Sequence, residues 1–79
     1  MRPKATNVLP KNDYILLIEF DNGEEKYFDL KPYLNKKPFK SLRDINEFKK
    51  VKISGLSIRW ENGADICPDE LYNLSVKAI

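Results

Sequence analysis

Alternating apolar and polar positions predict a β-hairpin in the first half of the chain. Residues 14–20 are rich in β-branched and aromatic side chains and predict a strand whose even-numbered positions share one apolar face. Ile15 and Leu17 occupy the other face, so we expect a central strand that is covered on both sides. Asn22-Gly23 predicts a tight turn because both residues tolerate a positive φ, and residues 25–30 predict the return strand.

The middle of the chain shows helical rather than strand periodicity. Residues 31–35 predict one helical turn, and a longer helix is expected to begin at Ser41 and to end near Lys49 and Lys50. Within that helix, the apolar residues recur at helical spacing, namely Leu42, Ile45 and Phe48.

Two further strands follow, and their alternation has opposite parity. Residues 51–53 place apolar side chains at odd positions, whereas residues 56–60 place them at even positions. A straight strand would send the two sets to opposite faces, so Ser54-Gly55 must form a bulge or a tight two-residue turn. A second Asn-Gly turn at residues 62–63 leads to a strand at 64–67, and Pro68 opens a last short helix.

These elements predict an α+β fold with one small, antiparallel, hairpin-rich sheet of about five strands and two or three short helices. We expect a single domain over residues 1–79, with a core at about 8–74 and mobile ends at 1–6 and 74–79. Residues after Asn73 in particular are expected to form a frayed end. The predicted core consists of Leu16, Ile18, Phe20, Phe28, Leu30, Leu42, Ile45, Phe48, Ile58, Trp60, Ile66 and Leu71.

Composition narrows the function classes. The 79 residues include no His and one Cys, which removes the usual general base, the commonest metal ligand and any internal disulfide. No apolar stretch follows the basic N-terminus, as a signal peptide would require, and no run is long enough to span a membrane. With a lone reduced thiol, this favours a cytoplasmic protein of bacterial type.

One stretch carries a resemblance to a known family. Residues 60–72, from Trp60 through Asn62, Gly63 and Asp65 to Tyr72, are similar to the terminal signature of bacterial domain-of-unknown-function family 2442. Upstream, Gly23 and several apolar positions lie where the family pattern places them, so the resemblance covers about residues 8–72. The family usually has Pro before Asn-Gly, where this chain has Glu61.

The resemblance implies a small α+β domain without an assigned activity. Some members add a C-terminal helix-turn-helix segment, and others are short chains encoded beside another small protein, which suggests pairing of the toxin–antitoxin kind. The printed chain ends soon after Tyr72, so the resemblance predicts no DNA reading through such a segment.

Candidate catalytic groups are few. Asp65, Asp69 and Glu70 cluster in sequence and offer acid–base or cation-binding chemistry, but a strand surface and a helix N-terminus explain them better. Cys67 has no His partner and is expected to pack as a small buried side chain, and Trp60 is expected in the core. We therefore expect no enzyme activity, no catalytic or metal residues and no cofactor.

The charge distribution is segregated. Residues 31–52 hold eight basic side chains and two acids, whereas residues 13–30 hold six acids and one base. A solvated surface, an acidic protein partner and nucleic-acid phosphates are the three explanations for the basic segment. Its candidate binding residues are Lys36, Lys37, Lys40, Arg43, Lys49 and Lys50.

The sequence thus predicts a protein-interaction or regulatory module, with weak nucleic-acid binding through residues 31–52 as the alternative. We expect an unknown protein partner and no membrane association. Residues 25–30 are expected to form an edge strand that is free to pair with a second copy, so a homodimer stays open. The two aromatic-acid-Asn-Gly hairpins at residues 20–23 and 60–63 reflect either duplication or convergence on good turn chemistry.

Overall fold

The computed structural model describes residues 3–78, and its β2–β3 hairpin is the one that the sequence predicts. Strand β2 (Ile15–Phe20) pairs antiparallel with β3 (Glu25–Asp29). In the connecting turn, Gly23 has a φ of +90°, whereas Asn22 is not among the residues with positive φ. The turn is therefore of type I followed by a left-handed glycine, rather than one with two left-handed residues. Asn22 contributes through its side-chain oxygen, which accepts from the Glu24 N–H at 3.0 Å.

Two strands that the sequence did not predict complete this sheet. Strand β1 (Ala5–Pro10) pairs with β2, and β7 (Val76–Lys77) pairs with β3, so the order is β1-β2-β3-β7. The expectation of a frayed end after Asn73 is wrong, because Ser75 is buried and the next two residues join the sheet. The expected edge strand is also internal along Lys26 and Tyr27, where β7 covers it.

A second, three-stranded antiparallel sheet contains β4 (Lys52–Ser54), β5 (Ser57–Arg59) and β6 (Asp65–Ile66). The parity change is resolved by a two-residue turn at Gly55 and Leu56, since Ser54 pairs directly with Ser57. Gly55 takes a φ of +58° at the first turn position. The prediction of about five strands in one sheet is thus corrected to seven strands in two sheets, within residues 3–78, while the α+β class and the single domain are confirmed.

The helical segments are short. In the part of the chain that the structure describes, three 3₁₀ turns lie at Asn12–Tyr14 (η1), Lys31–Tyr33 (η2) and Phe39–Arg43 (η3), and two α-helices lie at Ile45–Phe48 (α1) and Pro68–Leu74 (α2). The longer helix predicted from Ser41 is interrupted because Asp44 adopts an extended ψ of 115°. Its carboxylate accepts from the Asn46 N–H at 3.0 Å and caps α1, so Asp44 rather than Ser41 is the N-cap.

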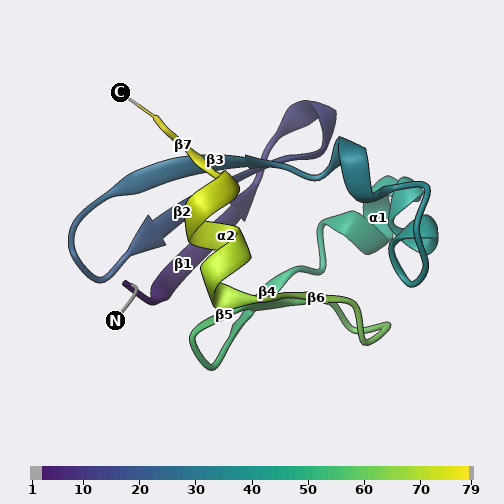
Figure 1. Cartoon of the computed structure of the whole chain (residues 1–79). Helices are drawn as coiled ribbons and strands as arrows, with labels where there is room; N and C mark the ends of the chain where they lie inside the picture. Colours follow the sequence, from purple (N-terminus) through teal and green to yellow (C-terminus); the bar gives the residue numbers. More distant parts are fainter. Residues whose placement is uncertain (1–2, 79) are drawn as a thin grey trace.

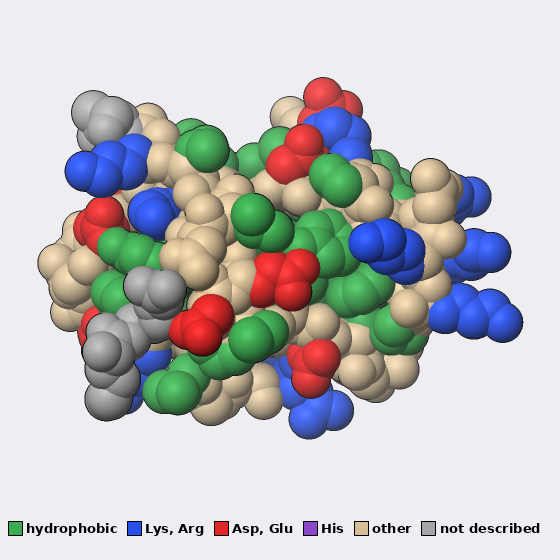
Figure 2. Space-filling view, viewed as in Figure 1, with side chains coloured by type: hydrophobic (Ala, Val, Ile, Leu, Met, Phe, Trp, Pro, Cys, Tyr) green, Lys and Arg blue, Asp and Glu red, His purple; other side chains and the backbone are tan. Residues whose placement is uncertain are grey.

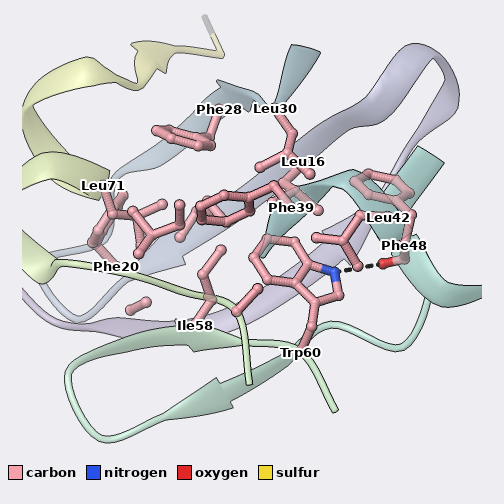
Figure 3. Close-up of a cluster of buried hydrophobic side chains, with 14 residues drawn as sticks. Leu16, Phe20, Phe28, Leu30, Phe39, Leu42, Phe48, Ile58, Trp60 and Leu71 are labelled. Carbon is pink, nitrogen blue, oxygen red and sulfur yellow. Dashed lines mark hydrogen bonds between the residues drawn. The ribbon is translucent and has the colours of Figure 1, made fainter. Parts of the chain in front are cut away.

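The core lies between the two sheets. Figure 1 shows α2 running from the small sheet to the four-stranded one and closing one side, while α1 and the 3₁₀ turns close the other end. Trp60 is completely buried at the centre, and its indole N–H donates to the Phe48 carbonyl at 2.9 Å (Figure 3). Every predicted core residue is buried except Ile45, which is 40% exposed because the helical periodicity does not continue through Asp44. The core also includes Ala5, Phe39 and Ala64.

Candidate interaction surface

The basic residues that the sequence singles out lie together at one end of the molecule. Figure 2 shows Lys and Arg side chains gathered at the right of the view, over the end that α1 and the 3₁₀ turns form in Figure 1. All six candidates are exposed. The structure therefore brings the predicted basic residues onto one end of the surface.

Half of these basic side chains already contact other groups of the protein. Arg43 donates to the Leu34 carbonyl at 3.1 Å and to the Asn35 side chain. These two hydrogen bonds hold the loop before η3 in place. Lys50 pairs with Glu47 at 3.0 Å, and the hydrogen bond to this carboxylate raises the Lys50 pKa. Lys36 lies over the Tyr33 ring, 5.6 Å from its centroid. The remaining three, Lys37, Lys40 and Lys49, make no hydrogen bond or ion pair within residues 3–78.

The family-signature residues have architectural contacts. Asn62 accepts from the Ala64 N–H at 3.0 Å and donates to the Pro38 carbonyl at 3.1 Å, so it joins the second hairpin to the loop before η3. Gly63 has a φ of +93°, which the turn requires. Tyr72 donates to Glu24 at 2.5 Å and packs edge-on against Phe20. These contacts connect the second hairpin to the loop before η3 and helix α2 to the β2–β3 hairpin.

Two hydrogen-bonded pairs of a carboxylate and a tyrosine have a member with a shifted pKa, namely Glu24 with Tyr72 and Tyr33 with Glu70. The Tyr72 hydroxyl, followed by the Asn22 amide, stabilises the Glu24 carboxylate and lowers its pKa from the usual 4.5. Burial, reinforced by a hydrogen bond to Glu70, raises the pKa of Tyr33 to about 12. Both pairs tie helix α2 to the β2–β3 hairpin or to η2, so we interpret them as structural contacts.

The acidic and thiol candidates are dispersed. Asp65 is exposed and faces Arg59 across the β5–β6 pair, and Glu70 accepts from the Tyr33 hydroxyl. Within residues 3–78, no three of the His, Cys, Asp or Glu side chains are grouped to hold a metal ion. Cys67 is exposed, which corrects the expectation that it packs as a buried side chain.

A feature that the sequence reasoning missed is an apolar row across the outer face of the four-stranded sheet. The register places Leu9 beside Leu17, Leu17 beside Tyr27, and Tyr27 beside Val76, so one residue from each strand contributes. Their exposed fractions are 42% for Leu9, 38% for Tyr27 and 64% for Val76, while Leu17 is half-buried. We call these four residues the apolar row.

The outer face is uncovered because the rest of the described chain packs against the inner one. The small sheet and α2 lie on the same side of the four-stranded sheet, with the core between them (Figures 1 and 3). Ile15 and Leu17 are consequently only half-buried, and the prediction that β2 is covered on both faces is wrong. The parity of Leu9, Leu17 and Tyr27 was visible in the sequence, but their alignment needed the register of β1.

Charges border the apolar row unequally. On one side, Glu19 of β2 and Glu25 of β3 are direct cross-strand partners, and neither side chain makes a hydrogen bond or ion pair within residues 3–78. On the other side, Asp29 is paired with Lys31 at 3.1 Å. Within residues 3–78, the surface is therefore apolar in the middle. At one end it carries two glutamates without an ion-pair partner, and at the other end the charge of Asp29 is neutralised by Lys31.

Comparison with known proteins supports the family resemblance. The family model described as "Protein of unknown function (DUF2442)" matches residues 5–77. The chain belongs to the DUF2442 family. No curated protein and no solved structure matches this DUF2442 chain.

The family match spans almost all of the elements described above. It runs from the first residue of β1 to the last residue of β7, so the strands that carry the apolar row lie within the DUF2442 domain. Neither α-helix in residues 3–78 has the length and apolar character needed to cross a bilayer.

Proposed function

We propose that the protein is a protein-interaction module that binds its partner on the outer face of the four-stranded sheet. The observation that carries this proposal is the apolar row, in which four strands each present an apolar side chain to water. A sheet face that bears a contiguous apolar patch is stabilised when another element covers it. A partner protein supplies such an element.

The proposed module acts by binding and not by catalysis. The chain has no imidazole to serve as a general base at neutral pH, and its one thiol, Cys67, is exposed on the surface. A regulatory pairing with a second small protein, of the toxin–antitoxin kind, is the specific form that the family resemblance suggested. We assign this function to the bacterial cytoplasm, where a single free thiol stays reduced.

Affinity capture tests the proposal. The tagged protein is incubated with nuclease-treated lysate of its native host, and the bound proteins are identified by mass spectrometry. The face variant is Leu9→Thr with Tyr27→Thr, because both positions are exposed and threonine keeps the β-propensity. The control variant replaces Lys36, Lys37 and Lys40 by Glu and leaves the apolar row unchanged.

We expect a discrete partner that the wild type and the lysine control both retain and that the face variant loses. Circular dichroism of the three proteins checks that each is folded. A partner captured equally by the face variant would show that the apolar row is not the docking surface.

A second candidate function is weak nucleic-acid binding at the basic end. It is supported by Lys37, Lys40 and Lys49, whose amino groups are exposed and have no partner within the described residues. Binding through phosphate contacts weakens steeply as salt rises. An affinity that is unchanged when Lys36, Lys37 and Lys40 are replaced by Glu would refute this candidate.

A further inference from the structure

We infer that the partner segment that docks on the outer sheet face is an amphipathic helix carrying Lys or Arg at the end nearest Glu19 and Glu25. The inference rests on the function proposed above and adds the chemistry of the partner. It follows from the distribution of charge around the apolar row and from the dimensions of the face.

The charge argument begins with the cross-strand pair. Glu19 and Glu25 lie directly opposite each other, where two like charges destabilise a sheet. No cation among residues 3–78 compensates them, although Lys31 compensates Asp29 at the other end of the same face. A bound segment with basic side chains at the Glu19–Glu25 end would relieve this repulsion and bring the two partners into register.

The dimensions favour a single helix. Ile15, Leu17 and Glu19 follow one another on the outer face of β2, and a strand rises about 3.3 Å per residue, so they span about 13 Å. A helix with a rise of 1.5 Å per residue covers that distance in about nine residues. An apolar stripe on such a helix would lie over Ile15 and Leu17, and its basic end would reach Glu19.

A second copy fits this face less well. A second copy would bring another Glu19–Glu25 pair to the interface, and neither pair has an ion-pair partner within residues 3–78. A helix with basic side chains avoids this repulsion and places opposite charges beside Glu19 and Glu25.

The test uses designed helical peptides as probes. The first has Leu on one face and three Lys at one end, the second replaces the Lys by Glu, and the third replaces the Leu by Ser. Affinities are measured by fluorescence anisotropy at low salt, and the contacted residues are mapped by shifts of backbone amide signals. The protein variants are Glu19→Gln with Glu25→Gln, the Leu9→Thr/Tyr27→Thr face variant, and a charge control, Glu61→Gln with Asp65→Asn on the other sheet.

We expect the Leu/Lys peptide to bind at least about tenfold more tightly than the Leu/Glu peptide, with amide shifts on β2 and β3. The Glu19→Gln/Glu25→Gln variant should reduce this preference to less than about threefold, and the charge control should retain it. The face variant and the Leu-to-Ser peptide should both abolish binding.

The alternative outcomes separate the inference from the proposed function. If both charged peptides bind equally and the face variant loses both, the face binds apolar segments and only the inferred charge preference is wrong. If no peptide binds, or binding survives in the face variant, the helix assignment is wrong, and the capture experiment independently decides the proposed function. If sedimentation shows a wild-type dimer that the face variant lacks, a second copy occupies the face and the inference is overturned.

Discussion

Replacing Trp60 by Phe should cost a large part of the stability of this small domain. The indole is completely buried, its N–H donates to the Phe48 carbonyl at 2.9 Å, and its ring lies edge-on to Phe39 with 6.2 Å between centroids. Phenylalanine keeps most of the apolar contact but removes this donor. The Phe48 carbonyl retains the longer hydrogen bond from the Val51 N–H at 3.4 Å, so the lost hydrogen bond costs about 0.5–1.5 kcal/mol. The smaller ring adds a packing loss, so we expect about 2–4 kcal/mol in total.

Urea unfolding followed by circular dichroism measures this effect, since the variant lacks the only tryptophan. Because about 1 kcal/mol shifts the melting temperature of such a domain by about 4–8 °C, the variant should melt at least about 8 °C lower. Tyr27→Phe is the matched control: it removes a hydroxyl with no hydrogen bond in the described structure from an exposed aromatic residue and should cost less than about 0.5 kcal/mol. Equal losses in the two variants would refute the assigned role of the buried indole.

Three further predictions concern the turn, the acidic pair and a tyrosine. Gly63→Ala should lower the free energy of unfolding in urea by about 1–2 kcal/mol, because the backbone φ of +93° strains a residue with a Cβ. No atom lies within 4 Å of the added Cβ, so a steric clash does not contribute. Gly63→Asn should lower it less, and equal stability of all three proteins would contradict this prediction. Glu25→Lys should raise stability by about 0.2–1 kcal/mol by replacing a repulsive cross-strand pair with an attractive one, and a lower melting temperature would count against the uncompensated charge. The pKa of Tyr33 is raised to about 12, so Tyr33 stabilises the fold fully below about pH 10 and loses this contribution as the pH rises toward 12. An ultraviolet difference titration of the wild type against Tyr33→Phe should show the high midpoint of Tyr33. A midpoint near pH 10 would disprove the prediction.

Local patterns were sufficient to predict the hairpins and most of the core. Leu16, Ile18 and Phe28 alternate with polar or outward-facing residues, and Gly23 defines the turn, so β2 and β3 depend on neighbours in sequence. Ile58 and Trp60 were predicted to be buried on the same basis. These predictions succeed because the alternation directly reflects which face meets the core.

The errors arise where a single residue interrupts a helical pattern or where a distant segment decides the structure. Ile45 follows the helical spacing of Leu42 and Phe48, but the extended Asp44 separates a 3₁₀ turn from an α-helix and leaves Ile45 outside the core. Strand β7 has only two residues and forms because β3 is available as a partner, which no local signal indicates.

The basic part of the candidate surface was predictable from the sequence, whereas the apolar row was not. The clustering of Lys37, Lys40 and Lys49 follows from their proximity in sequence, and their exposure was expected of lysines. The apolar row combines residues from four strands, so it requires the register of β1 on β2 and of β7 on β3. A single sequence does not supply these two registers.

The pairing of β7 with β3 has a consequence for synthesis on the ribosome. The β2–β3 hairpin can form early, but α2 contributes Leu71 to the core and is followed directly by β7, so this side of the core closes only after Val76 and Lys77 have emerged. Until then, the part of the inner sheet face around Phe20, against which Tyr72 of α2 packs, is open as well as the outer face. A chaperone or a partner made nearby therefore has access to this part of both sheet faces before α2 has docked.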